Sequence, residues 1–499
     1  MISLVFARSC LRALVGFGLC SSLPALAGDG DATKLRKPNI VLLFADDAGY
    51  RDFGFQGSRT MRTPHLDRLA REGTRFSQAY VTDPTCGPSR AGLLTGRYQQ
   101  RFGFEENNVP GYMSANSKLD GAEMGLPLAE RTIADHLRAR GYRTGLLGKW
   151  HQGDADHYHP LRRGFDEFYG FRGGSRSYWP YTDPLQPSPQ NKMERGFGNY
   201  REHEGYLTDA LAMEAVSFIR RNRERPFFLF VSFNAVHTPM EALPEDLAAF
   251  RTLLGVRRLA AAQMLALDRA SGAILAELMA NGLEGETLVV FANDNGGEVP
   301  HNGSVNYPLA GTKATFLEGG LRIPMLMRWP GRVATGRVYH QPVSLLDLLP
   351  TFLDAAGGDP SAIPGLDGTS LLPYLTGNKA GRPHRTLFWK RGARAAIRDH
   401  DWKLLRHSDR PAELFDLRRD VGEQRDLASR RPDILRMLFR KLFAWETKLE
   451  RPLWMLRGEY DRSDIEWMDH YRTPSETWRG LDSMHNRCSR GLTRSLVCQ

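Results

Sequence analysis

Two pairs of oxygen-bearing side chains follow apolar runs and could hold a metal ion. Asp46 and Asp47 follow NIVLLFA, and Asp294 and Asn295 follow TLVVFAN. Neighbours in a regular strand point to opposite faces, so the chain must turn at the aspartate pair if both are to face one ion. Adjacent carboxylates repel without a cation, and four oxygen donors suit a hard ion such as calcium or magnesium. The alternative is an aspartate pair that caps a turn, which aspartate also favours.

A second set of side chains offers cations and imidazoles. Lys149 and His151 lie in GKWH, and residues two apart in a strand share a face. His237 ends the run PFFLFVSFNAVH, and Lys313 lies in a loop before another apolar run. A single histidine is more often structural than catalytic. Several chain segments that each deliver such a group indicate a catalytic site.

The first residues are typical of an export signal. Within residues 1–27, Arg8 and Arg12 give the first part a positive charge. An apolar run follows, and the segment ends in Ala-Leu-Ala, a small-x-small cleavage site. The apolar run is too short for a spanning helix, which needs about 20 residues. The sequence therefore predicts a periplasmic or secreted protein with no membrane partner.

Export determines which cysteines remain. Removal of the signal removes Cys10 and Cys20, and an oxidising compartment would permit a disulfide between Cys488 and Cys498. Cys86, in TCGPSRAGLLTGR, is then left without a partner, and an odd cysteine in an exported chain requires an explanation. A thiol-redox role is disfavoured because no second cysteine lies near it in the sequence.

Composition restricts the partners. The 499 residues are 41% hydrophobic and 25% charged, as in ordinary globular proteins, and the net charge is +10. A basic surface suits nucleic acid, an anionic membrane or an acidic substrate. No Lys-rich tail or nucleic-acid motif is present, so an anionic substrate is predicted and a nucleic-acid partner is not.

Apolar runs alternate with helical patterns along most of the chain. Strands are predicted at 38–47, 144–151, 226–239, 287–297 and 322–331, and helices at 63–73, 131–142, 257–281 and 344–357. This alternation predicts an α/β fold with a large, mostly parallel sheet sandwiched by helices. Ligands of such sheets bind beyond the carboxyl ends of the strands, where the polar groups described above would meet.

The C-terminal part has a different pattern. AAIRDHDWKLLRH and ELFDLRR read as antiparallel strands, and PDILRMLFRKLFAWETKL reads as a helix. We therefore predict a catalytic domain over 38–384, a smaller α+β subdomain over 385–450 and a C-terminal tail over 451–499.

Two loops offer further candidate sites. The stretch HQGDADHYHP contains Asp154, Asp156, His157 and His159, which invites a zinc site, but no second ligand pair lies at the usual spacing. A loop that touches substrate is the favoured interpretation.

The loop GFRGGSRSYWPY offers two arginines for additional anionic groups and two aromatic rings for stacking on sugars. The candidate substrate residues are Arg172, Arg176 and Trp179, with Tyr178 beside them. An ordinary glycine-rich surface loop is the equally weighted alternative.

The stretch CGPSRAGLLTGR matches the signature C-x-P-S-R followed by L-T-G-R. The chain resembles the type I, formylglycine-dependent sulfatases of the alkaline phosphatase superfamily, from Asn39 to about Leu427. The order of the motifs also agrees: NIVLLFADD, CGPSR, GKWH, HTP, NDNGG and GTK with EGGLRIP.

The resemblance implies that a formylglycine-generating enzyme oxidises Cys86 to Cα-formylglycine (3-oxoalanine). One hydroxyl of the hydrated aldehyde would attack the sulfur of a sulfate ester to give a sulfo-enzyme, and the other would then expel sulfate. One calcium ion, held by Asp46, Asp47, Asp294 and Asn295 together with residue 86, would polarise the sulfate.

The resemblance also assigns roles to the basic groups. Arg90 and Lys149 would hold the hydrate and the charge on the metal side, and His151 would bond the hydroxyl that later loses its proton. Lys313 and His237 would grip the sulfate and the bridging oxygen, one of them acting as general acid. Gln152 departs from the apolar residue that the family often has after GKWH.

The implied function is a sulfuric ester hydrolase that acts on a sulfated saccharide. One alternative is an arylsulfatase of broad specificity. Another is a formylglycine-dependent phosphonate or phosphodiester hydrolase, although such enzymes usually pair the third metal aspartate with histidine and this chain has Asp294-Asn295. A carbohydrate-binding relative with a dead site predicts losses among the cysteine and metal ligands, and none is lost.

Overall fold

A ten-stranded sheet forms the centre of the computed structural model, which describes residues 37–117, 119–182 and 189–478. The strands are β1 (Asn39–Ala45), β2 (Thr74–Tyr80), β3 (Arg143–Lys149), β4 (Glu167–Phe171), β5 (Glu194–Arg195), β6 (Phe227–Ser232), β7 (Thr287–Asn293), β8 (Arg322–Arg328), β9 (Arg337–Tyr339) and β10 (Val343–Ser344). Their order is β10-β2-β8-β7-β1-β6-β3-β4-β5, with β9 paired to β2. The predicted signal peptide and Cys10, Cys20, Cys488 and Cys498 lie outside the described residues.

The four central strands are parallel. Ile40 of β1 aligns with Phe228 of β6 and with Leu288 of β7, and Thr144 of β3 aligns with the same Phe228. The carboxyl ends of β7, β1, β6 and β3 therefore lie along one edge of the sheet. β8 runs antiparallel to β7 and β2, because the chain returns from β7 through loops and two short helices rather than through a crossover helix. The predicted mostly parallel sheet is confirmed.

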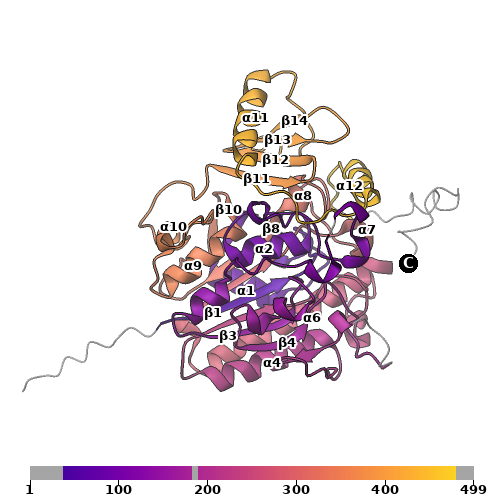
Figure 1. The fold of residues 1–499 in the computed structure, drawn as a ribbon. Helices are drawn as coiled ribbons and strands as arrows, with labels where there is room; N and C mark the ends of the chain where they lie inside the picture. The colour runs from indigo at the N-terminus through magenta and orange to yellow at the C-terminus, as the bar shows by residue number, and fades with distance from the viewer. Residues whose placement is uncertain (1–36, 118, 183–188, 479–499) are drawn as a thin grey trace, which may run out of the picture. The chain divides into compact units, whose positions relative to one another are not determined.

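Side-chain alternation along β1 feeds two hydrophobic cores. Ile40, Leu42 and Phe44 pack on one face, and Val41, Leu43 and Ala45 pack on the other, as expected for a strand buried on both sides. The first face is covered by α3 (Ile133–Arg138) and α9 (Leu348–Ala355), and the second by α1 (Pro64–Glu72), α4 (Leu207–Asn222) and α6 (Gly255–Ala280) (Figure 1). α4 had no counterpart among the predicted helices.

The helix α2 (Cys86–Thr95) begins at the cysteine itself. All ten of its residues are buried, and Gly96 ends it in the left-handed conformation with φ 64°. Shorter helices complete the loops around the sheet. They are α5 (Pro244–Ala248), α7 (Val299–Asn302), α8 (Glu318–Leu321) and α10 (Leu372–Leu375).

A second, antiparallel sheet follows, as predicted. It consists of β11 (Thr386–Arg391), β12 (Arg394–Asp399), β13 (Trp402–Arg406) and β14 (Glu413–Asp416), and α11 (Pro432–Glu446) packs on one face. The other face joins the core of the large sheet. Trp389 lies 5.6 Å from the ring of Tyr80, and its indole Nε1 donates to Val81 O at 2.7 Å. The architecture thus changes near residue 385 while the core continues, and the predicted domain boundaries stay predictions.

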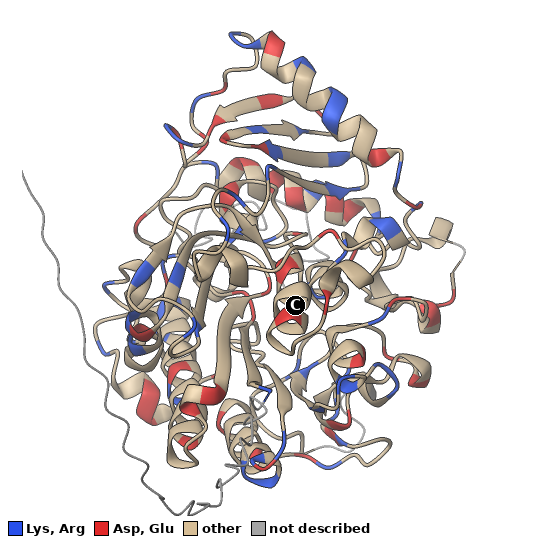
Figure 2. Cartoon of the chain, turned by 90° about the vertical axis from the view of Figure 1, so that its left-hand side faces the viewer, with Lys and Arg blue, Asp and Glu red and all other residues tan. Residues whose placement is uncertain are grey.

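The segment after α11 contains one more helix, α12 (Gly458–His470), which the sequence analysis did not find. Lys and Arg are interspersed with Asp and Glu over the helices and loops in the view of Figure 2, while the central strands carry few charges. None of the helices in the described ranges is long and apolar enough to cross a membrane.

Candidate active site

The carboxyl ends of β1 and β7 bring the predicted oxygen ligands together. Ligand atoms of Asp46, Asp47, Cys86 and Asp294 all lie within 4.8 Å of one another. The Cys86 Sγ lies 3.7 Å from Asp46 Oδ1 and 4.0 Å from Asp47 Oδ1. The chain turns as the aspartate pair required, because Asp47 adopts a left-handed φ of 59°. A non-glycine residue in this conformation costs free energy and is typical of functional sites.

The donor set fits a hard cation. Asp46, Asp47 and Asp294 are fully buried, and burial raises the pKa of Asp294, with Asp46 adding to the effect. Burial likewise raises the pKa of Asp47, against the opposing charge of Lys313. Asn295 donates from Nδ2 to Asp47 Oδ1 at 2.7 Å, while its buried Oδ1 has no hydrogen-bond partner. Buried carboxylates beside an orphaned amide oxygen are the ligand chemistry that calcium prefers.

Arg90 and Lys149 offset the negative charge of the carboxylates. Lys149 is the last residue of β3, and Arg90 contacts Ser232, the last residue of β6. Arg90 donates from NH2 to Asp46 Oδ2 at 3.2 Å and to Asp294 Oδ2 at 2.9 Å, and from NH1 to Ser232 Oγ at 2.6 Å. The Lys149 ammonium forms an ion pair with Asp46. Burial would raise the pKa of Asp46, but Lys149 and its neighbouring cations outweigh it and hold the pKa below its ordinary value.

Lys313 offsets the negative charge of Asp47 and Glu298. Its Nζ lies 2.6 Å from Asp47 Oδ2 and 3.8 Å from Glu298 Oε1. Burial would lower the pKa of Lys313, but Asp47 outweighs it and the pKa is raised. Ala314, the next residue, has a φ of 68°, so the loop is bent where it delivers the lysine. Glu298 was not predicted, although it follows the NDNGG motif directly.

His237 does not end a strand as predicted. β6 ends at Ser232, and His237 lies in the following loop with its Nε2 3.5 Å from Asp47 Oδ2. Its Nδ1 lies 2.6 Å from Thr238 O, a backbone acceptor, which assigns the proton to Nδ1 and turns Nε2 toward the carboxylates. Burial and Lys313 lower the pKa of His237 to about 4.

His151 lies two residues beyond β3 with a φ of 55°, so strand alternation does not extend to it. The ring is buried, and neither of its nitrogens has a hydrogen-bond partner. Burial lowers its pKa, and Lys149 and Arg90 add to the effect. Gly174 packs against the ring, where an added Cβ would lie 2.7 Å from Nε2. The ring is thus held neutral beside the cationic groups.

Cys86 is 2% exposed, and it is the free cysteine of the described chain. Burial and the charge of Asp294 raise the pKa of its thiol well above the ordinary value. The thiol is therefore protonated at neutral pH, and a protonated thiol is a poor nucleophile. Asn107 supports the start of α2, since its Oδ1 accepts from Gly87 N at 2.9 Å.

The residues of the zinc alternative do not converge. Asp156 pairs with Arg172 at 2.7 Å, and His159 Nε2 lies 3.4 Å from Glu194 Oε2. Within the described ranges, the candidate metal-binding groups found all contain Asp46 and Cys86.

The loop predicted to bind substrate is held by internal ion pairs. Arg172 donates from Nε and NH2 to Glu194 at 2.8 and 2.9 Å, and Arg176 pairs with Glu202 at 2.5 Å. Both arginines are buried. Trp179 packs edge-on against Tyr206, with ring centroids 5.5 Å apart. These contacts favour the alternative of a structural loop, and the assignment of the three side chains to substrate stays a prediction.

This loop instead positions both histidines. His151 N donates to Arg172 O at 2.9 Å, and the Tyr178 hydroxyl donates to Asn234 O at 2.8 Å and to His237 O at 2.9 Å. The loop therefore contacts the candidate site through its backbone and through the Tyr178 hydroxyl.

A cleft of about 510 Å³ opens beside the cluster. Its inner end is formed by Thr85, which precedes the cysteine, and by Glu298 and Lys313. Its outer part lies between Tyr112 and residues of α12. A substrate group in the cleft would therefore lie next to Lys313.

The comparisons with known proteins agree with this geometry. The sulfatase family model matches residues 38–358, and the model described as the N-sulphoglucosamine sulphohydrolase C-terminal region matches residues 312–448. The chain belongs to the sulfatase family. It is therefore a sulfuric ester hydrolase, and this family generally uses formylglycine and a metal ion.

Curated relatives match most of this sulfatase. It is 36% identical over 400 residues to N-acetylgalactosamine-6-sulfatase of Canis lupus familiaris, which covers 77% of this chain and 74% of the relative. It is 34% identical over 514 residues to steryl-sulfatase of Mus musculus, which covers 81% of this chain and 80% of the relative.

Solved structures share the fold. The crystal structure of Ps i-CgsB has a TM-score of 0.78 at 38% identity, covering 86% of this sulfatase and 98% of that chain. The phosphonate monoester hydrolase of Agrobacterium radiobacter has a TM-score of 0.59 at 21% identity, covering 82% and 96%, which shows the shared fold alone. The predicted alkaline phosphatase-like architecture is confirmed.

Proposed function

We propose that this sulfatase hydrolyses sulfate esters of saccharides, with Cys86 oxidised to formylglycine as the nucleophilic residue. The observation that carries the proposal is the position of Cys86, buried within 4.8 Å of the ligand atoms of three carboxylates and surrounded by basic side chains. Its raised thiol pKa argues against thiolate chemistry. Hydrated formylglycine at this position would supply a hydroxyl nucleophile in place of the thiol.

Asp46, Asp47, Asp294 and Asn295 would hold one calcium ion, which would polarise the sulfate and lower the pKa of a bound hydroxyl. The orphaned Oδ1 of Asn295 and the three buried carboxylates support this assignment. Arg90 fixes Asp46 and Asp294 through its guanidinium, so that both carboxylates keep their orientation.

The basic side chains have separate tasks in this proposal. Lys149 and Lys313 form ion pairs with different aspartates of the cluster and stabilise the anionic sulfate. His151, neutral and without a hydrogen-bond partner, is available to accept a proton from the hydroxyl at residue 86. Lys313 and His237 would face the leaving oxygen. The lowered pKa of His237 leaves its Nε2 without a proton at neutral pH, whereas the Lys313 ammonium carries one, so the lysine is the favoured donor.

The saccharide substrate is supported by the relatives and by the cleft. Ps i-CgsB has been solved in complex with k-i-k-neocarrahexaose, and N-acetylgalactosamine-6-sulfatases are named for a sulfated sugar. The cleft beside Lys313 has room for more than a single sulfate group. Hydrolysis of simple aryl sulfates would use the same nucleophile and remains the second reading of the site.

Maturation completes the proposal. A signal peptide over residues 1–27 would direct the chain to the periplasm or the exterior, and a formylglycine-generating enzyme would recognise CGPSR around Cys86. We retain the catalytic domain over 38–384 and the subdomain over 385–450 as units of this architecture.

The test combines mass spectrometry with activity. The peptide that carries residue 86 should have the mass of the aldehyde, lower than that of cysteine, in active preparations. Cys86→Ala should remove sulfate release from both 4-nitrophenyl sulfate and a monosulfated disaccharide, while the circular dichroism spectrum stays unchanged. Full activity with wholly unmodified Cys86 would refute the proposal.

A further inference from the structure

The outer wall of the cleft is made by a segment that neither family model covers. The second model ends at residue 448, and α12 begins ten residues later at Gly458. Figure 1 shows α12 above α7 and to the right of the C-terminal sheet. Arg457, Tyr460 and Trp467 of this segment line the cleft whose inner end is Lys313.

The chain leading to α12 is laid along the loop that follows α2. Leu456 forms an isolated antiparallel bridge with Met113, and Arg457 N donates to Tyr112 O at 3.1 Å. Trp454 is 1% exposed, and its Nε1 donates to Asn107 O at 3.1 Å. The same Asn107 accepts from the second residue of α2, so the segment is connected to the start of the catalytic helix.

The middle of α12 is fixed by a buried carboxylate. Asp464 is 8% exposed and pairs with Arg391 and with Arg394, the latter at 2.7 Å. Arg391 also donates to Ala314 O at 2.9 Å, next to the lysine of the site. A buried pair of this kind holds its partners in one arrangement, because separating them would leave charges without compensation.

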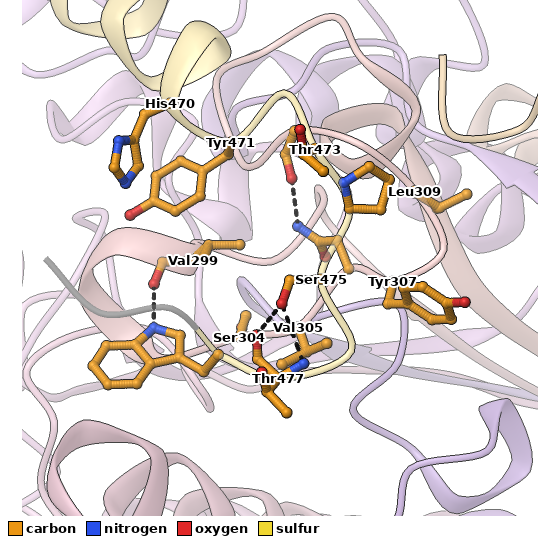
Figure 3. A pocket seen from close by; sticks show the side chains of 14 residues that line it. Val299, Ser304, Val305, Tyr307, Leu309, His470, Tyr471, Thr473, Ser475 and Thr477 are labelled. Carbon is orange, nitrogen blue, oxygen red and sulfur yellow. Dashed lines mark hydrogen bonds between the residues drawn. The ribbon is translucent and has the colours of Figure 1, made fainter. Parts of the chain in front are cut away.

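The end of α12 is fixed to the loop that carries Glu298 and Lys313. Gly311 N donates to Tyr471 O at 2.9 Å, and Trp478 Nε1 donates to Val299 O at 2.8 Å. Figure 3 shows Tyr471 and His470 facing Val299 across a second cavity of about 320 Å³. α12 is therefore a fixed wall of the cleft, anchored at its beginning, middle and end.

The side chains on this wall have the chemistry of a sugar site. Tyr112 and Tyr460 lie 4.9 Å apart at a tilt of 38°, and Trp467 lies 5.3 Å from the ring of His301. Aromatic faces stack on the apolar faces of sugar rings. The Arg457 side chain is half-exposed and lies 4.0 Å from the Glu459 carboxylate, a distance too long for a close ion pair.

We infer that residues 454–467 form a specificity site for the leaving saccharide of this sulfatase. The aromatic side chains receive a sugar ring adjacent to the scissile sulfate, and Arg457 binds a second anionic group, a sulfate or carboxylate, on the neighbouring residue. The inference rests on the proposed function, because it places the scissile sulfate at Cys86 and Lys313. A guanidinium suits such a group, because its fork of donors matches the oxygens of sulfate.

The experiment compares three substrates: 4-nitrophenyl sulfate, a monosulfated disaccharide and a disaccharide sulfated on both sugars. Arg457→Ala should lower kcat/KM for the disulfated disaccharide about tenfold, equivalent to about 1.4 kcal/mol, mainly through KM. Its kcat/KM for 4-nitrophenyl sulfate should change less than about twofold, since this ester does not reach Arg457. Tyr460→Ala should lower kcat/KM for both disaccharides, and Tyr460→Phe should have the kcat/KM of the wild type.

Arg462→Ala is the matched control, because Arg462 is an exposed arginine of α12 that does not line the cleft. The inference is overturned if Arg457→Ala lowers kcat/KM equally for all three substrates. It is also overturned if Arg457→Ala and Arg462→Ala have the same small effect on kcat/KM for the disulfated disaccharide. Wild-type enzyme that releases sulfate from none of them would instead contradict the proposed function. In that case, calorimetric binding of the disulfated disaccharide to Cys86→Ala, with and without Arg457→Ala, still decides the role of the wall.

Discussion

If the proposed calcium site exists, replacement of Asp294 by asparagine should abolish most of the stabilisation that bound calcium would give this sulfatase. Asp294 is fully buried at the end of β7, and its Oδ1 accepts from Asp47 N at 3.3 Å while its Oδ2 accepts from Arg90. Asparagine keeps the shape and one oxygen but removes the charge. A calcium ion would then face one fewer carboxylate in the same cluster.

The expected size follows from mass action. At free calcium about 100 times its dissociation constant, the wild type gains about 2.7 kcal/mol of unfolding free energy. If Asp294→Asn weakens calcium about 100-fold, the gain falls to about 0.4 kcal/mol under the same conditions. Guanidinium unfolding followed by tryptophan fluorescence, with calcium and with a chelator, measures both values without reference to activity.

The matched control is Asp246→Asn on α5. Asp246 is also a buried aspartate with a bidentate arginine partner, since Arg269 lies 2.7 Å from Oδ1 and 3.0 Å from Oδ2. Its replacement should alter stability equally with and without calcium. The reasoning is refuted if Asp294→Asn keeps the full calcium-dependent gain of the wild type, or if the wild type shows no gain at saturating calcium.

Three further predictions concern other parts of the molecule. Burial raises the pKa of Glu106 to about 8. Its protonated carboxyl therefore contributes fully to folding stability below its ordinary pKa of 4.5, and this contribution is lost as the pH rises through 8. The unfolding free energy of Glu106→Gln relative to the wild type should therefore be higher at about pH 9 than at about pH 5, and denaturation at these two pH values measures the difference. Trp454→Ala should cost about 3–5 kcal/mol of unfolding free energy, because a buried ring packed on Phe104 is removed. Lys313→Met should reduce turnover of a saccharide sulfate more than that of 4-nitrophenyl sulfate, because an alkoxide needs a proton and an activated phenolate does not.

Each of these has an outcome that contradicts it. A pH-independent difference between Glu106→Gln and the wild type would show that the carboxyl is not protonated in the folded protein. An unchanged unfolding midpoint for Trp454→Ala would mean that residues 451–457 are not docked as described. Equal losses on both substrates for Lys313→Met would transfer the proton-donor role to His237.

The central strands could be predicted because each is a continuous apolar run. The oxygen donors after β1 and β7 follow those runs directly, whereas His237 lies in the loop beyond Ser232, which the apolar run alone did not reveal. β2 was missed because TRFSQAY mixes buried and half-buried positions and lacks such a run. The antiparallel direction of β8 depends on the path of the loops before it, which composition does not reveal. α4 shows apolar residues at helical spacing and could have been found.

The candidate site was predicted from motifs, and the motifs do not reveal ion-pair partners that are distant in sequence. Arg172 and Arg176 read as free cations because their acidic partners, Glu194 and Glu202, lie outside their loop. The contact of Arg391 with the region beside Lys313 depends on how the second sheet docks, which no local pattern specifies. Whether a charged side chain meets substrate or another residue is decided by such long-range packing.

The contacts around Cys86 also impose an order on events during synthesis. The cysteine begins a helix with no exposed residue, and the chain that finally covers its surroundings includes Arg391 and Trp454, several hundred residues later. A nascent chain without those residues would lack this part of the packing around CGPSR, and the proposed modifying enzyme would be able to reach the cysteine. Once the C-terminal segment has docked, an unoxidised cysteine is enclosed at 2% exposure. If Cys86 is oxidised as we propose, the modifying enzyme would have to act between translation of CGPSR and docking of the C-terminal segment.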